Sequence, residues 1–121
     1  MSTIKAISAL MVEDNIDHAE LMLEAFHEFN IKNVINHAMD GEQAIAFLRN
    51  EPPYEDKNKF TIPDIIFLDI RMPRQGGMET LEIIKADNNL CDIPVVMIST
   101  STTDPEIKKC YRLGANGFIT K

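Results

Sequence analysis

The sequence predicts an α/β fold with a parallel sheet and helices on both of its faces. Short apolar runs alternate along the chain with segments whose apolar residues recur at helical spacing. Four of these runs stop abruptly at polar residues, and the groups that follow include carboxylates, a hydroxyl and an ammonium. Parallel strands joined by right-handed crossovers end at one edge of the sheet, where open α/β sheets bind their ligands. We therefore expect a functional site at this edge.

Two strand–helix units are expected in the first part of the chain. The apolar run at residues 8–12 is followed by Asn15, whose side chain suits a helix start. A weaker strand at residues 34–35 leads through the turn-like Asp40-Gly41 into a second helix. The residues expected to face inward are Ala19, Met22, Leu23 and Phe26 in the first helix, and Ala44, Phe47 and Leu48 in the second.

A long polar stretch follows the second helix. Pro52-Pro53 ends that helix, because the residue before a proline is disfavoured in helical conformation. The stretch at residues 51–61 is longer than the few residues that usually join two elements. We expect it to be an inserted surface loop.

Three strands and two intervening helices are expected in the second part of the chain. Residues 64–69 are expected to form a strand whose continuous apolar run, Ile65 to Leu68, is of the kind found in strands buried on both faces, and further strands are expected at 95–98 and 118–120. Gly76-Gly77 allows a turn into one helix, and Asp104-Pro105 is a favourable start for the next. The residues expected to face inward are Met78, Leu81 and Ile84 in the former, and Ile107, Cys110, Tyr111 and Gly114 in the latter.

Length and charge limit the classes to which the protein can belong. At 121 residues the chain fits one domain with a single core. A formal net charge of -7 and a pI near 4.8 argue against a surface that binds nucleic acid or an anionic membrane. No apolar stretch approaches the roughly 20 residues that span a bilayer, and the N-terminus lacks the layout of a signal peptide. A cytoplasmic location is expected.

The cysteines and histidines show no spacing typical of a metal site. Cys91 and Cys110 lie far apart with no CxxC pattern, so neither a disulfide framework nor a thiolate site is indicated. His18, His27 and His37 likewise lack ligand spacing, and we expect them to be structural or surface groups.

Carboxylates dominate the polar groups at the expected strand ends. Glu13, Asp14 and Asp69 would repel one another in a cleft unless a cation lay between them. Hard oxygen ligands suit Mg²⁺ or Mn²⁺, and such an ion keeps open positions for phosphoryl oxygens. Lys121 adds a positive charge, a carboxylate such as Asp69 can attack phosphorus, and Ser99 can donate a hydrogen bond to a phosphoryl oxygen. The sequence therefore indicates a site that handles phosphate.

The same residues resemble the receiver domain of two-component response regulators. The resemblance spans almost the whole chain, and its motifs are highly specific as an ordered set. They are Val12-Glu13-Asp14-Asn15, Pro63 to Pro73 with Gly77, Pro94 to Ser99, and Gly114 to Lys121. The chain, residues 1–121, is accordingly interpreted as one receiver domain.

The resemblance implies a phosphoacceptor and a metal site. Asp69 would accept the phosphoryl group. Asp14 and Asp69 would bind Mg²⁺ or Mn²⁺ directly, with the backbone carbonyl of Arg71 as a third ligand and Glu13 acting through water.

The resemblance also implies a pair of residues that change conformation on phosphorylation, and a particular fold. Ser99 and Phe118 match the positions at which a hydroxyl and an aromatic ring move together when phosphate arrives, and Lys121 matches the phosphate-binding lysine. The family's fold is flavodoxin-like, a doubly wound (βα)5 sheet with strand order 2-1-3-4-5.

The function implied is that of a phosphorylation switch. The chain would take its phosphoryl group from a sensor histidine kinase or a phosphotransfer protein and act on a downstream protein or on a second copy of itself. It would catalyse only its own phosphorylation and dephosphorylation. The alternative is a receiver fold that serves as an interaction or dimerisation module without depending on phosphorylation.

The sequence departs from the family pattern at Arg71, Gly76 and Thr100 and at its C-terminal end. Arg71 stands two residues after Asp69, where its side chain can cover the phosphate or pair with Glu13, and Thr100 occupies a position that is usually small. The loop at residues 51–61 resembles that of single-domain regulators partnered with phytochrome-type kinases. The final helix of the family is missing after Lys121, and we expect the sequence to be truncated there.

Overall fold

The fold alternates strands with helices. A computed structural model describes residues 7–28, 33–72, 75–99 and 103–120. The elements are β1 (Ile7–Val12), α1 (Ile16–Glu28), β2 (Asn33–Ala38), α2 (Gly41–Leu48), β3 (Ile65–Asp69), α3 (Gly77–Ala86), β4 (Val95–Ser99), α4 (Asp104–Arg112) and β5 (Gly117–Thr120). This order agrees with the sequence prediction, although β2 is longer than the two residues expected.

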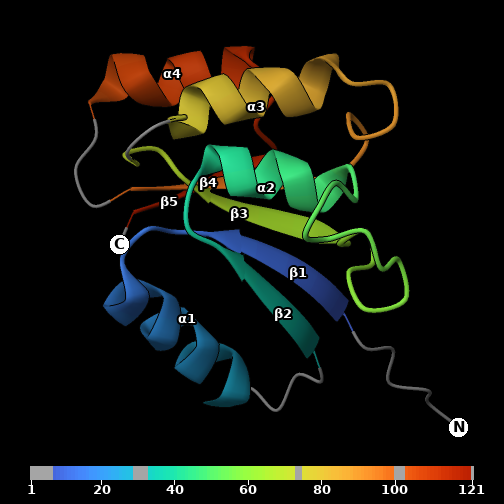
Figure 1. The fold of residues 1–121 in the computed structure, drawn as a ribbon. Helices are drawn as coiled ribbons and strands as arrows, with labels where there is room; N and C mark the ends of the chain where they lie inside the picture. Colours follow the sequence, from blue (N-terminus) through green and yellow to red (C-terminus); the bar gives the residue numbers. More distant parts are fainter. Residues whose placement is uncertain (1–6, 29–32, 73–74, 100–102, 121) are drawn as a thin grey trace, which may run out of the picture.

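The strands form one parallel sheet in the order β2-β1-β3-β4-β5. Figure 1 shows α1 on one face of this sheet and α2, α3 and α4 together on the other. The flavodoxin-like topology and the strand order 2-1-3-4-5 are therefore confirmed. Within the described residues, no helix combines the length and apolar character required to cross a membrane.

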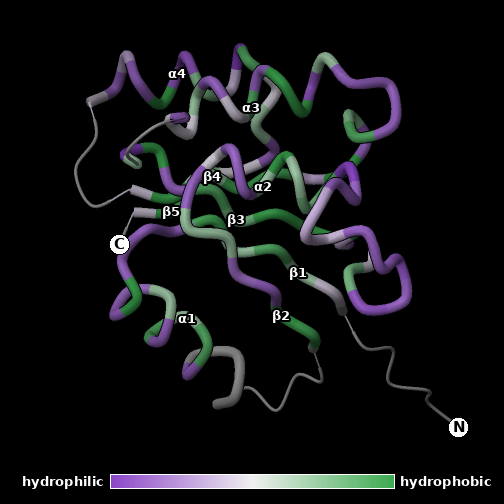
Figure 2. Tube along the Cα trace, in the orientation of Figure 1, coloured by the Kyte–Doolittle hydropathy of each residue, from purple (hydrophilic) through white to green (hydrophobic). Residues whose placement is uncertain are grey.

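The core divides into two clusters, one on each face of the sheet. The larger cluster joins the sheet to α2, α3 and α4, with fully buried residues such as Leu10, Leu68 and Leu81. The smaller is centred on Phe67, against which Met22 of α1 packs. Figure 2 shows β3 as a continuous hydrophobic segment. Because side chains alternate between the faces of a strand, this continuous run serves both clusters at once.

The loop after α2 is anchored by aromatic side chains. Tyr54 and Phe60 meet Phe47 of α2 and each other edge to face, with ring centroids 5.2–5.7 Å apart. Asn50 ends the preceding turn with a φ of 52°, a left-handed conformation that asparagine tolerates. Its side-chain amide donates to the carbonyls of Tyr54 and Phe60. The expected surface loop is therefore present, and its base is attached to the larger core cluster.

One residue expected to face inward on α4 lies outside. Cys110 is buried and Ile107 is half-buried, as expected, but Tyr111 is 49% exposed. Helix α4 leads into β5, which is the edge strand of the sheet, where less of the sheet is available to cover a helix. Only a narrow stripe of α4 is therefore buried, and the prediction for Tyr111 was wrong.

Candidate functional site

Strand register brings the expected site residues to one edge of the sheet. Val12 of β1 is paired with Leu68 of β3, so the next residues, Glu13 and Asp69, emerge side by side. Asp69 is in turn paired with Ile98 of β4, which places Ser99 one position beyond it.

Three carboxylates meet at this edge. Oxygen atoms of Glu13, Asp14 and Asp69 all lie within 4.8 Å of one another. Glu13 and Asp69 are only 1% and 5% exposed, whereas Asp14 is exposed. Charges so close together, two of them removed from water, need a positive counterpart. The all-oxygen donor set and the exposed side of the cluster fit a hard divalent cation that keeps part of its coordination open.

Backbone amides orient two of these carboxylates. The N–H of Asn15 donates to Glu13 Oε1 over 3.2 Å, and the N–H of Arg71 donates to Asp69 Oδ1 over 3.2 Å. Asn15 also begins α1, because its side-chain oxygen accepts from the N–H groups of Asp17 and His18. The start of α1 and the orientation of Glu13 are thus set by the same short turn.

Gly77 lets the first turn of α3 approach the backbone of Asp69. The N–H of Gly77 donates to the carbonyl of Ile70 over 3.0 Å. A Cβ added at Gly77 would overlap the carbonyl oxygen of Asp69 and lie 2.7 Å from Ile70 Cα. No side chain fits in this contact, so the backbone of α3 packs directly against the end of β3 that carries Asp69.

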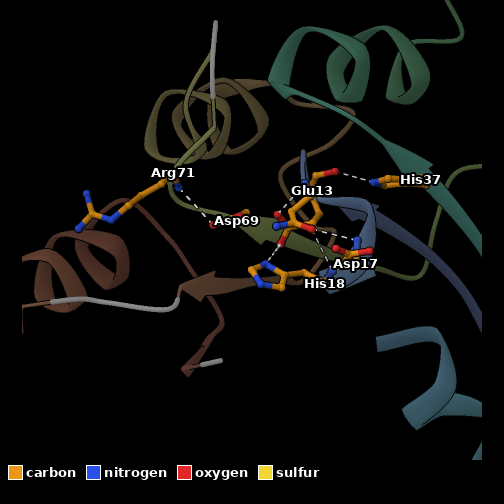
Figure 3. Close-up of polar contacts among 7 residues, drawn as sticks. Glu13, Asp17, His18, His37, Asp69 and Arg71 are labelled. Carbon is orange, nitrogen blue, oxygen red and sulfur yellow. Dashed lines mark hydrogen bonds and ion pairs between the residues drawn. The ribbon is translucent and has the colours of Figure 1, made fainter. Parts of the chain in front are cut away.

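Two histidines contact Glu13, which the sequence did not indicate. The ring Nε2 of His37 on β2 donates to the backbone carbonyl of Glu13, and Nδ1 of His18 on α1 lies 3.9 Å from Glu13 Oε2 (Figure 3). His37 is paired in register with Met11, two residues before Glu13. The pairing of β1 with β2 would have shown this proximity, whereas histidine spacing along the chain does not.

Arg71 directs its side chain to α4. Its Nη2 donates to both carboxylate oxygens of Glu106, at 3.1 Å each. Figure 3 shows the guanidinium extending away from Glu13. The partners expected for Arg71 from the sequence are phosphate or Glu13, whereas its partner in the structure is Glu106, 35 residues further along the chain. The two residues help to line an open groove of about 630 Å³ that also borders Asp14.

The remaining predicted site residues lie at the ends of β4 and β5. Ser99 is buried, and Phe118 is half-buried and packs against the larger core cluster. Thr120 of β5 is paired with Ser99. Thr100 and Lys121 lie outside the described residues.

Comparison with known proteins identifies the family. The response regulator receiver domain family matches residues 9–121, which is nearly the whole chain. The chain belongs to this family. The receiver resemblance predicted from the sequence is therefore confirmed.

Relatives of this receiver domain include regulators from archaea and cyanobacteria. It is 34% identical to the probable methanogenesis regulatory protein FilR2 of Methanothrix harundinacea, over 93% of this chain and 70% of that protein. It is 33% identical to the response regulator Rcp1 of Synechocystis sp., over 93% of this chain and 74% of Rcp1. The solved structure of the phosphorylated cyanobacterial phytochrome response regulator RcpA superposes with a TM-score of 0.88 at 36% identity, covering 97% of this chain and 81% of RcpA.

Family membership gives the general function. Receiver domains of response regulators act as phosphorylation-based switches that interact with histidine kinases or phosphotransfer proteins. Single-domain members are generally not enzymes. Receiver domains bind Mg²⁺ or Mn²⁺ at an acidic pocket, and Rcp1 has been solved in a Mn²⁺-bound form. In this receiver domain, Glu13, Asp14 and Asp69 form an acidic cluster.

Proposed function

We propose that Asp69 is the phosphoacceptor of this receiver domain. The observation that carries the proposal is the meeting of Glu13, Asp14 and Asp69 at the carboxyl ends of two adjacent strands. Asp69 is the central member, because it ends β3, the middle strand of the sheet, and its carboxylate is held by the N–H of Arg71. Asp14 is more exposed and Glu13 is turned toward α1, which suits both to serve a metal.

The chemistry is a transfer from a phosphorylated histidine to a carboxylate. One oxygen of Asp69 forms a bond to phosphorus while the P–N bond of the donor breaks. The electron pair of that bond stays on the imidazole nitrogen, which takes a proton from solvent. An ionised carboxylate is ready for this attack because no proton has to be removed from it.

Positive charge is needed around the transferring group. A Mg²⁺ or Mn²⁺ ion held by Asp14, Asp69 and the carbonyl of Arg71, with Glu13 acting through water, would offset the negative charge of the carboxylates and of the phosphoryl group. Lys121, which follows Thr120 in the chain, is proposed as a second cation for the phosphoryl oxygens.

The proposed readout involves the end of β4 and β5. Ser99 would donate to a phosphoryl oxygen from the strand next to Asp69. Phe118 is half-buried at present and would turn further inward, which changes the surface formed by α4 and β5. A downstream protein or a second copy of the chain would recognise that surface.

The proposed donor is a sensor histidine kinase or a phosphotransfer protein. The likeness to the phytochrome response regulator RcpA supports a phytochrome-type kinase as the class to test first. The proposal includes a cytoplasmic location, where response regulators typically act. Apart from its own phosphorylation and dephosphorylation, no catalytic activity is proposed.

The test is incubation with acetyl phosphate and Mg²⁺, followed by intact-mass measurement. Wild type is expected to gain one phosphoryl group, and Asp69→Asn is expected to gain none. Asp64→Asn is the matched control, because Asp64 precedes the opposite end of β3 and its side chain accepts from the N–H of Ser8, as an amide oxygen still can. The control should react like wild type. A wild type that stays unmodified would instead favour the interaction module that does not depend on phosphorylation.

A further inference from the structure

Arg71 connects the acidic site to α4. Its backbone N–H donates to Asp69 Oδ1, whereas its guanidinium donates to both oxygens of Glu106. A single residue thus contacts the proposed phosphoacceptor through its main chain and the first turn of α4 through its side chain. Figure 3 shows the bond from the backbone of Arg71 to Asp69 and the side chain of Arg71 extending away from Asp69.

Glu106 is a local anchor of α4. It also accepts a hydrogen bond of 3.3 Å from Thr103 Oγ1, and Thr103 is the N-cap residue whose side chain makes no capping bond to the helix backbone. Cys110 is the one buried residue of α4. Among the described residues, the contact between Glu106 and Arg71 is thus a direct attachment of the first turn of α4 to the segment that follows β3.

The side chain of Arg71 lies in a groove that borders Asp14, a member of the acidic cluster. Arg71 and Glu106 line the groove beside Asp14, and the side chain of Arg71 is 57% exposed. A phosphoryl group carries more negative charge than one carboxylate and offers three acceptor oxygens. Arginine matches the geometry of phosphate with two parallel donors, and Nη2, one of these donors, reaches the carboxylate of Glu106. A phosphoryl group on Asp69 is thus a strong competitor for this side chain.

We propose that Arg71 exchanges Glu106 for the phosphoryl group when Asp69 is modified. In the unmodified protein Glu106 is a positioning residue that keeps the guanidinium of Arg71 paired with α4. The inference rests on the proposed role of Asp69. The exchange of Glu106 for the phosphoryl group has two consequences. Glu106 lowers the affinity of the site for a phosphoryl group, because its bond to Arg71 must first be broken. The exchange also releases the first turn of α4 from the loop that follows β3.

The test is a double-mutant cycle with beryllium fluoride and Mg²⁺, which form a noncovalent copy of an acyl phosphate on a carboxylate. Calorimetric titration compares wild type, Glu106→Gln, Arg71→Gln and the double variant. Glu106→Gln is expected to bind roughly two- to fivefold more tightly than wild type, as the loss of one partly exposed ion pair implies. Arg71→Gln should bind more weakly, and Glu106→Gln should have no further effect in its presence.

Glu79→Gln is the matched control for charge. Glu79 is exposed in the first turn of α3 and lines the same groove, but its carboxylate is not the ion-pair partner of Arg71. If the gain in affinity came only from removing a negative charge, Glu79→Gln would reproduce it and the effect of Glu106→Gln would persist without Arg71. Either result overturns the exchange.

The outcomes separate the inference from the proposed function. Binding to wild type with an unchanged affinity in Glu106→Gln overturns the exchange alone and leaves Asp69 as the phosphoacceptor. Absence of binding to wild type overturns both. A gain that depends on Arg71 and shrinks at high salt, where a partly exposed ion pair is screened, supports the exchange.

Discussion

Helices α2 and α4 cover the same face of the sheet but are attached to it very differently (Figure 1). Five of the eight residues of α2 are buried, and Asp40 caps it by accepting from the N–H of Gln43. Of the nine residues of α4 only Cys110 is buried, and Thr103 provides no side-chain cap. Burial raises the pKa of the Cys110 thiol, which therefore stays protonated at neutral pH and packs as a small apolar group.

The difference extends to the strands beneath the helices. Four of the five residues of β3 are buried, whereas none of the four residues of β5 is. Asp69 of the acidic cluster lies at the end of β3, which is mostly buried. The predicted switch residue Phe118 lies on β5, none of whose residues is buried. Elements with few buried contacts are the ones that rearrange at least cost. The molecule thus combines a well-packed strand that carries Asp69 with a more loosely packed region at α4 and β5.

The largest expected difference between the two regions is in the free energy of unfolding lost when a large side chain is replaced by alanine. Leu81→Ala on α3 removes a fully buried side chain and should lower the free energy of unfolding by about 3 kcal/mol. Tyr111→Ala on α4 removes a half-exposed side chain and should change it by less than about 0.5 kcal/mol. Urea denaturation of both variants measures the two changes in the free energy of unfolding. Similar losses would mean that α3 and α4 are equally well packed.

A smaller contrast is expected between two neighbouring glycines. Gly77→Ala should lower the free energy of unfolding by ~2 kcal/mol, because the new methyl group overlaps the backbone of Asp69. This loss would exceed the gain of about 1 kcal/mol that alanine brings to a helix.

Gly76→Ala is the control for that substitution. A Cβ at Gly76 meets its nearest neighbour, the carbonyl oxygen of Ile70, at an ordinary 3.8 Å. Denaturation of the two variants should therefore differ clearly. If Gly77→Ala left the free energy of unfolding unchanged, the close approach of α3 to the end of β3 would be contradicted.

The smallest contrast is between the two helix starts. Asp40→Ala removes the cap of α2 and should cost about 1 kcal/mol. Thr103→Ala should have a much smaller effect, because the Thr103 hydroxyl donates to Glu106 and accepts no capping bond from the backbone N–H groups of α4. Thermal unfolding distinguishes them, and an equal shift in Tm would show that both helices depend on their caps.

The fold and the acidic cluster could be predicted because both follow from local patterns. The apolar runs define the strands, and parallel strands necessarily bring Glu13, Asp14 and Asp69 to one edge. Family resemblance then supplied the roles of these residues, and the family itself is confirmed.

Contacts between distant elements could not be predicted in the same way. The pairing of Arg71 with Glu106 depends on where α4 lies over the sheet, and the contact of His37 with Glu13 depends on the register of β2. Tyr111 was placed inside by helical spacing, but spacing does not reveal how much of a helix face the sheet can cover.

The account depends most on Asp69 being the residue that is modified. The direct measurement is to treat the phosphorylated protein with borohydride, which reduces an acyl phosphate of aspartate to homoserine, and to locate the product by peptide mass spectrometry. The account predicts homoserine at position 69 alone. Reduction at Asp14 or at Glu13, or at no position in a protein that carries phosphate, would contradict it.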